Sequence, residues 1–244
     1  MDYGVYLSSD FDTLPKNLNC NLLVIDAQNF TAEEIALLHE DNKNIYSYIN
    51  IGAVENFRDY YETYLGLTLG PYENWPEERF VDVSEPSWRK FIVDDLAQEL
   101  KEKGIDGFFV DNADVYYEYN TRAVFEGITE ILEGLKETGM SVIVNGGDVY
   151  VAEYCSENGD PTNILDGVNQ ECVFTAINWE NESFEESSDD TEQYYLDYLK
   201  NLESFGVKIY LLEYTTDEKL EDMIREKVDE LGYSVYISDD LELD

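Results

Sequence analysis

The chain has 244 residues, of which 43% are hydrophobic, and domains of this size bury roughly 70–75% of their unfolded surface, so one large core is expected. No stretch approaches the about 20 apolar residues that a membrane-spanning helix needs. The 55 acidic and 15 basic side chains give a formal charge of −40, which argues against a nucleic acid partner because phosphate backbones are bound by clusters of Lys and Arg. Such a charge attracts cationic polymers at low salt, although it also serves simply to keep a protein soluble.

Cysteine usage and the start of the chain bear on its compartment. Cys20, Cys155 and Cys172 are an odd number, so any disulfide would leave one thiol unpaired, and they show no CxxC spacing typical of a zinc site. After its first two residues the sequence opens on a strand-like segment, without the regions of a signal peptide. We therefore expect either a cytoplasmic protein or a chain whose leader has been removed.

Short apolar runs rich in β-branched and aromatic residues alternate with amphipathic segments along the chain, which is typical of βαβ units in a parallel sheet. We expect eight strands, over Tyr3–Leu7, Leu22–Asp26, Ile45–Ile49, Gly107–Asp111, Ser141–Asn145, Gly167–Val173, Lys208–Glu213 and Ser234–Ile237. A helix is expected from Thr31, which forms a capping-box pair with Glu34, to about Asn42. Further helices are expected over Trp88–Lys103, Arg122–Thr138, Thr191–Phe205 and Asp217–Leu231.

These elements predict an α/β fold, namely a single-domain (β/α)8 TIM barrel over residues 1–244. A doubly wound open sheet is the alternative. No GxGxxG or P-loop motif follows a predicted strand, so the usual nucleotide-binding reason for an open sheet is missing. The longest irregular segment, from about Asn50 to Pro86, follows the third strand, and loops of this length are usually functional.

Polar residues stand at or near the carboxyl ends of the predicted strands, where barrel enzymes place their reacting groups. They are Asp26, Asp111, Asp114, Asn145, Glu171 and Glu213. An acid in an apolar strand is costly unless it is paired or protonated. One such acid is readily explained by a partner such as Arg58, but four or more at one end of a barrel indicate a functional site.

The one histidine, His39, falls in a predicted helix away from the strand ends. This argues against Ser-His-Asp and Cys-His catalysis and against every multi-histidine metal site, and leaves carboxylate chemistry. Two carboxylates that flank a glycosidic bond can hydrolyse it without a cofactor. Aromatic side chains suited to stacking on sugars stand at strand ends or in loops, among them Tyr48, Trp179 and Tyr214.

Two other functions stay open on these grounds. A non-catalytic carbohydrate-binding barrel would use the same aromatic residues, and carboxylates more than about 10 Å apart would favour it over a hydrolase, which needs roughly 5–9.5 Å. A Mg²⁺-dependent lyase or phosphatase would use Asp26, Asp111 and Asp114 as ligands.

Six segments occur in a shared order along nearly the whole chain. They are LLVID at 22–26, SYINIGAVENFRDYYE at 47–62, NWPEERFVDVSEPSW at 74–88, GIDGFFVDNADVY at 104–116, VNQECVF at 168–174 and YLLEYT at 210–215. These segments resemble glycoside hydrolase family 114, the endo-α-1,4-polygalactosaminidases. The fourth segment is the most specific of the six.

The resemblance implies an extracellular or cell-surface (β/α)8 glycosidase that cleaves partly de-acetylated galactosamine polymers with the catalytic pair Asp111 and Glu171. It implies no cofactor and no metal, and we expect a monomer. The substrate-binding residues are expected to be Asp26, Tyr48, Arg58, Asn112, Asp114, Asn145, Trp179, Glu213 and Tyr214. Free amino groups make such polymers cationic, which agrees with the charge of the chain. Glu171 precedes the apolar run 172–174, so we expect it to be the acid of the pair, with a raised pKa.

Overall fold

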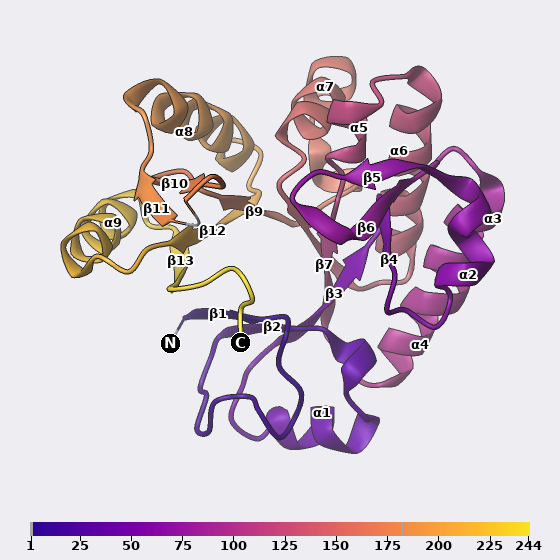
Figure 1. Ribbon diagram of the computed structural model, residues 1–244, viewed down its shortest axis with the longest axis horizontal. Helices are drawn as coiled ribbons and strands as arrows, with labels where there is room; N and C mark the ends of the chain where they lie inside the picture. Colours follow the sequence, from indigo (N-terminus) through magenta and orange to yellow (C-terminus); the bar gives the residue numbers. More distant parts are fainter. Residues whose placement is uncertain (1, 182) are drawn as a thin grey trace.

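Eight parallel strands form one sheet in the computed structural model, which describes residues 2–181 and 183–244 (Figure 1). Their order in the sheet, β1-β2-β3-β7-β8-β9-β12-β13, follows the chain. The strands are β1 (Tyr3–Tyr6), β2 (Leu22–Ile25), β3 (Ile45–Asn50), β7 (Gly107–Asp111), β8 (Ser141–Asn145), β9 (Gly167–Glu171), β12 (Lys208–Tyr214) and β13 (Ser234–Ser238). The first and last strands meet, with the ring centroids of Tyr6 and Tyr236 5.4 Å apart. The predicted (β/α)8 barrel is confirmed, and the open-sheet alternative is wrong.

Helices cover the outside of the sheet (Figure 1). They are α1 (Ala32–Leu38), α3 (Pro86–Lys90), the π-helical η3 (Phe91–Leu96), α4 (Ala97–Glu102), α6 (Arg122–Glu137), α7 (Asp148–Asn158), α8 (Asp189–Glu203) and α9 (Glu218–Leu231). The predicted capping box is present, since Thr31 and Glu34 each accept a hydrogen bond from the other's backbone amide. Helix α1 ends earlier than expected, and the backbone amide and side chain of Asn42 both donate to the Leu38 carbonyl at its end.

Side chains of alternate residues on each strand fill two separate apolar layers. On β7, Phe108 packs in the layer between the sheet and the helices, and Phe109 packs inside the barrel. The inner layer also holds Tyr3, Tyr48 and Tyr214, which carry polar groups toward the carboxyl ends of the strands. This strand alternation therefore decides which residues reach the barrel interior.

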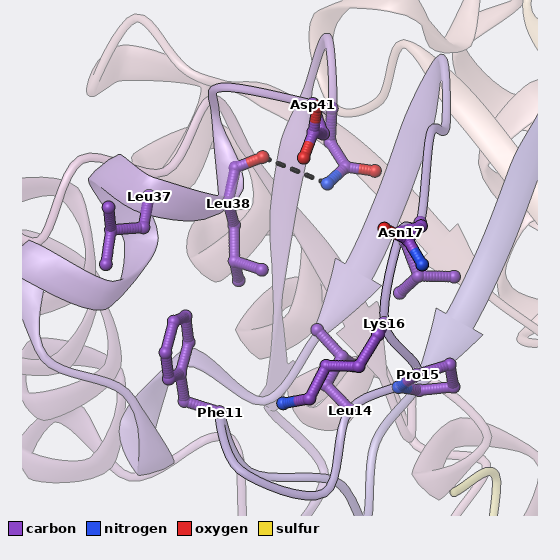
Figure 2. A pocket seen from close by; sticks show the side chains of 10 residues that line it. Phe11, Leu14, Pro15, Lys16, Asn17, Leu37, Leu38 and Asp41 are labelled. Carbon is purple, nitrogen blue, oxygen red and sulfur yellow. Dashed lines mark hydrogen bonds between the residues drawn. The ribbon is translucent and has the colours of Figure 1, made fainter.

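The connection between β1 and β2, residues 7–21, forms no helix, and every one of its residues is described. Its apolar side chains, including Phe11 and Leu14, face Leu37 and Leu38 of α1 around a cavity of about 160 Å³ (Figure 2). The connection from β1 to β2 thus packs against α1 through the side chains of an irregular segment.

The segment after β3 is not irregular, so this prediction was wrong. It contains β4 (Ala53–Glu55), β5 (Thr68–Tyr72) and β6 (Trp75–Val81), which form an antiparallel sheet, and the short helices α2 (Tyr61–Tyr64) and η2 (Leu65–Leu67). The strands escaped prediction because β5 and most of β6 are half exposed and carry charged residues, glycine and proline. This sheet lies beside the end of β3 and β7 (Figure 1).

Other elements also appear only in the structure. Helix α7 buries Tyr150, Val151 and Tyr154, but its apolar and polar residues do not separate onto two faces, so its periodic signal is weak. A hairpin of β10 (Thr175–Asn178) and β11 (Ser183–Glu186) follows the sixth barrel strand, which ends at Glu171, two residues earlier than expected. The short helices η1 (Ala27–Asn29), α5 (Val115–Glu118) and η4 (Pro161–Asn163) complete the set.

Two features of the chain bear on its environment. All three cysteines are free thiols. Among the described residues, no helix combines the length and the apolar character needed to cross a bilayer.

Candidate active site

Three neighbouring strands end in polar residues, namely Asp111 on β7, Asn145 on β8 and Glu171 on β9. The Nδ2 atom of Asn145 donates to Asp111 Oδ1 at 2.9 Å and to Glu171 Oε1 at 2.7 Å. Two acceptors that share one planar NH₂ group lie roughly 5 Å apart, a separation suited to a pair of catalytic carboxylates. The barrel therefore brings together the two acids expected to act as a pair.

The orientation of the bridging amide is fixed from inside the barrel. Asn145 Oδ1 accepts a hydrogen bond from Asn169 Nδ2 at 2.7 Å, and Asn169 Oδ1 accepts one from the Tyr3 hydroxyl at 2.9 Å. All three side chains are buried. Because its oxygen is occupied by a donor, Asn145 must turn its NH₂ group toward the carboxylates.

The backbone turns in the same way directly after each of these three residues. Asn112, Gly146 and Cys172 have left-handed backbones, with φ of 63°, 59° and 56°. This conformation is uncommon for residues other than glycine and is concentrated at functional sites. At Gly146 a Cβ atom would also lie 2.8 Å from Asp114 Oδ2, so a larger residue there would push the Asp114 carboxyl aside.

Burial raises the pKa of both catalytic candidates. At Asp111, hydrogen bonds from Asn145, Tyr48 and a backbone amide act in the opposite direction. Glu171 accepts hydrogen bonds from Asn145 and from the Tyr214 hydroxyl, at 2.8 Å, and the nearby charge of Asp111 raises its pKa further. The hydrogen bonds to Glu171 lower its pKa as those to Asp111 do, and the charge of Glu55 raises the pKa of Asp111, so opposing effects act on both acids.

Glu78 of β6 reaches the same end of the barrel and was not identified from the sequence. Its Oε2 accepts hydrogen bonds from Asn50 Nδ2 at 3.1 Å and from Asn112 Nδ2 at 2.9 Å. Burial, and then the charge of Asp111, raise the pKa of Glu78 to about 8. No signal in the sequence distinguishes Glu78 from its acidic neighbour Glu77, because both lie in the insert and away from the barrel strands.

Asp114 lies three residues beyond Asp111 and faces the β8–α7 turn. Its Oδ1 accepts a hydrogen bond from the Gly147 backbone amide at 3.1 Å. Burial, and then the charge of Asp111, raise the pKa of Asp114 to about 7. This acid is thus partly protonated near neutral pH.

Four carboxyl groups gather at this end of the barrel without a basic partner. Across residues 2–181 and 183–244, no ion pair involves Asp111, Glu171, Asp114 or Glu78. Tyr72 of β5 lies among them, since burial and then the charges of all four acids raise its pKa. A cation bound among these acids would lower their pKa values and so favour their ionised forms.

Asp26 and Arg58 belong to a separate cluster of acids, which contains a basic side chain. Arg58 bonds to Asp26 at 2.7 Å and to Glu55 at 3.0 Å, and the three side chains are only 7%, 5% and 2% exposed. The guanidinium also lies 4.9 Å from the ring centroid of Phe57 and 6.0 Å from that of Tyr48. This differs from the expectation that Asp26 and Arg58 line the substrate surface, because each is bonded to the other and buried.

Glu213 lies behind the site rather than at its surface, which also differs from the expectation. Its side chain has no exposed area. Its carboxylate accepts hydrogen bonds from the backbone amides of Val173, Phe174 and Thr175, at 3.0 to 3.1 Å, and from the Thr175 hydroxyl at 2.6 Å. Strand alternation explains this position, since the next residue, Tyr214, faces the barrel interior.

Trp179 stands in the turn of the β10–β11 hairpin and is 43% exposed. Its ring meets that of Trp75, edge to face, with centroids 6.2 Å apart. Trp75 is paired across the β5–β6 turn with Tyr72, which lies among the four acids. The two inserted hairpins therefore touch each other beside the carboxylate site.

This geometry argues against the two competing functions, a non-catalytic carbohydrate-binding barrel and a Mg²⁺-dependent enzyme. The carboxylates share one donor, whereas a binding barrel without catalysis would not need two acids so close together. In the part of the chain that the structure describes, no group of three or more His, Cys, Asp or Glu side chains is arranged to hold a metal ion, so the residues proposed as Mg²⁺ ligands do not form a common site.

A (β/α)8 barrel with two neighbouring carboxylates at its strand ends is typical of barrel glycoside hydrolases. The sequence matches glycoside hydrolase family GH114 over residues 3–244, and the chain belongs to this family. Among curated proteins, none matches the chain.

Solved structures show the same fold. The glycoside hydrolase domain of PelA from Pseudomonas aeruginosa is 17% identical, with a TM-score of 0.77 over 100% of this chain and 95% of that chain. Ega3 from Aspergillus fumigatus, in complex with galactosamine, is 16% identical, with a TM-score of 0.74 over 100% and 92%. A maltogenic α-amylase from Thermotoga neapolitana is 11% identical, with a TM-score of 0.63 over 99% and 69%. The family identifies the protein as a glycoside hydrolase, and these likenesses show its barrel fold.

Proposed function

We propose that this glycoside hydrolase cleaves polymers of α-1,4-linked galactosamine and N-acetylgalactosamine, with Asp111 and Glu171 as its catalytic pair. The observation that carries the proposal is the Asn145 bridge, in which one NH₂ group donates to an oxygen of each carboxyl group, so that the two acids lie close together. The complex of Ega3 with galactosamine supports the substrate class. The unpaired acids of the site and the formal charge of −40 favour a polymer with free ammonium groups.

The separation of the pair favours a double displacement with retention of configuration. Retaining glycosidases hold their carboxyl groups about 5–5.5 Å apart, and inverting enzymes need roughly 6.5–9.5 Å to admit a water molecule between acid and sugar. In the first step the Asp111 carboxylate attacks the anomeric carbon while the glycosidic bond breaks. Glu171 donates its proton to the departing oxygen, and a glycosyl ester on Asp111 results.

In the second step Glu171, now ionised, takes a proton from water as the water oxygen attacks the anomeric carbon and the ester bond to Asp111 breaks. The products are a free sugar end, an Asp111 carboxylate and a reprotonated Glu171. Tyr214 and Asn145 hold Glu171 in place through both steps, since each donates to one of its oxygens.

Substrate contacts are proposed for the groups around the pair. Asp114 and Glu78 are placed to accept hydrogen bonds from ammonium or hydroxyl groups of the sugar. Asn112 donates a hydrogen bond to Glu78, and Tyr48 donates one to Asp111. Trp179, together with Trp75, offers an exposed aromatic surface on which a neighbouring sugar ring can stack.

The proposed substrate also bears on where and how the protein acts. A long cationic polymer does not cross a membrane, so we place the activity outside the cell or at its surface. One chain supplies every carboxyl group named above, which favours a functional monomer. The double displacement consumes only water and requires no cofactor.

The test is product release from de-N-acetylated and fully acetylated galactosamine polymers. We expect wild type to cleave, Asp111→Asn and Glu171→Gln to be inactive, and Glu137→Gln, which removes an exposed acid on α6, to behave as wild type. A lower KM for the de-acetylated polymer would support recognition of positive charge. No release from either polymer by wild type would reject the proposed substrate, and cleavage by both site variants would reject the catalytic pair.

A further inference from the structure

The segment that follows Glu171 is held by three consecutive residues at the end of β12. The Leu212 carbonyl accepts a hydrogen bond from the Cys172 amide at 3.0 Å. The Glu213 carboxylate binds the amides of residues 173–175, and the Tyr214 hydroxyl donates to Glu171 Oε2 at 2.8 Å. Every residue from 171 to 175 is therefore bonded to the same strand end.

Thr175 closes this network. Its hydroxyl donates to Glu213 Oε2 at 2.6 Å and accepts a hydrogen bond from the Tyr214 amide at 3.3 Å. Glu213 has no exposed surface, so these bonds compete with no water. Backbone amides that converge on a buried carboxylate are strong, charge-assisted donors, and removing their acceptor leaves several buried groups unsatisfied at once.

The backbone of Cys172 shows why such a restraint is needed. A left-handed φ of 56° at a residue with a side chain is strained and persists only where its surroundings enforce it. The Cys172 amide and the three amides after it are all occupied by β12. Without Glu213 the segment is free to relax, and the Glu171 carboxyl would move with it.

We propose that Glu213 is a positioning residue for Glu171: from behind the site, its carboxylate holds residues 173–175 in place and so sets both the distance from Glu171 to Asp111 and the burial of the Glu171 carboxyl. The catalytic meaning of this inference rests on the proposed function. The structural part of the inference does not depend on the proposed function, because the position and titration of Glu171 can be measured without a substrate.

The experiment compares Glu213→Gln and Thr175→Val with Thr175→Ser and Ile224→Ala. Glu213→Gln presents an NH₂ group to backbone donors, and Thr175→Val removes the hydroxyl at nearly constant volume. Thr175→Ser keeps the hydroxyl, so it should restore most of the activity that valine loses. Ile224, fully buried on α9, serves as a control for loss of stability alone.

We expect Glu213→Gln and Thr175→Val to lower kcat about 10- to 100-fold with little change in KM, as for a small misplacement of a reacting group. Greater exposure of Glu171 should lower its pKa and move the basic limb of the pH–rate profile toward acid. Ile224→Ala should lower Tm without moving that limb. If the two variants kept the wild-type pH profile, or lost activity only in proportion to Tm, Glu213 would be merely structural and the inference overturned.

A readout without substrate separates this inference from the proposed function. The pKa of Glu171 is measured by NMR of protein with ¹³C-labelled Glu side chains, assigned by comparison with Glu171→Gln. A lower Glu171 pKa in Thr175→Val than in Thr175→Ser supports the positioning role even if wild type cleaves no galactosamine polymer. Equal pKa values in both variants would overturn it even if the polymer is cleaved. If Glu213→Gln fails to fold, Thr175→Val tests the inference in its place.

Discussion

Two clusters of acids at the same end of the barrel differ in one respect, the presence of a cation. Asp26 and Glu55 share Arg58, and all three side chains are almost fully buried. Asp111 and Glu171 share only the neutral amide of Asn145. The guanidinium of Arg58 pairs with both acids of the first cluster, whereas the amide of Asn145 brings no charge to the second. We therefore expect the first cluster to stabilise the barrel and the second to carry the proposed chemistry.

The largest expected effect separates the two roles within the second cluster. Glu171→Gln should lower the rate on polymer by about 10⁴-fold or more, as removal of a catalytic group does in other hydrolases. On an aryl α-galactosaminide whose leaving group needs no proton, it should recover much of the rate of glycosylation. Asp111→Asn should stay inactive on both substrates because it lacks the nucleophile. Equal loss of both variants on both substrates would contradict the assigned roles.

A smaller loss is expected when the bridge between the acids is removed. Asn145→Ala deletes the donor shared by Asp111 and Glu171, so the two carboxyl groups are no longer held in their relative positions. We expect kcat to fall by about 10²-fold, comparable to removal of one preorganised donor in other active sites. Steady-state kinetics on polymer measure this change. A variant that retained half of the wild-type kcat would show that the bridge is dispensable.

Mutation of the first cluster should change the stability of the protein rather than its catalytic rate. Arg58→Met leaves the buried Asp26 and Glu55 uncompensated, which costs about 3–5 kcal/mol in comparable buried pairs and roughly 10 °C in Tm. At a temperature where the variant is folded, its kcat should stay within a few-fold of wild type.

A triple variant sharpens that test. Adding Asp26→Asn and Glu55→Gln to Arg58→Met removes the unpaired charges, so thermal unfolding should recover most of the lost Tm. A triple variant as unstable as Arg58→Met would show that packing of the guanidinium against Phe57 and Tyr48, and not charge balance, stabilises this region.

The smallest expected effect is on the pH dependence of stability. In the folded protein, burial raises the pKa of Asp114 and Glu213 to about 7 and that of Glu78 to about 8. Because these values lie above those of the unfolded chain, the folded state binds more protons between about pH 4 and 8, and stability falls as pH rises through that window. Tm should be higher at pH 5 than at pH 8 by roughly 5 °C.

A matched pair of variants separates the effect of the buried acids on the pH dependence of Tm from the effect of repulsion among surface charges. Glu78→Gln should reduce the fall in Tm between pH 5 and 8. Glu137→Gln removes one exposed charge and should leave the slope as in wild type. Identical slopes in the two variants would assign the effect to net charge alone.

The same contrast explains which site residues could be predicted from the sequence. Asp111, Asn145 and Glu171 end apolar strands, and their common position in a barrel predicts that they converge. Asp26 and Glu213 also stand at strand ends, but both are buried and bonded to partners. These partners, Arg58 and the amides of 173–175, come from other parts of the chain. Glu78 gave no signal, since a half-exposed insert carries it to the site.

Strand periodicity, helix caps and polar residues at strand ends are local properties of the chain, and they were enough to predict the barrel and the positions of the proposed catalytic acids. Which acids are paired, which are buried behind the site and which have no basic partner emerged only on folding. These outcomes depend on donors and cations brought from distant segments, and the free energy of a buried carboxylate is set by the groups that surround it.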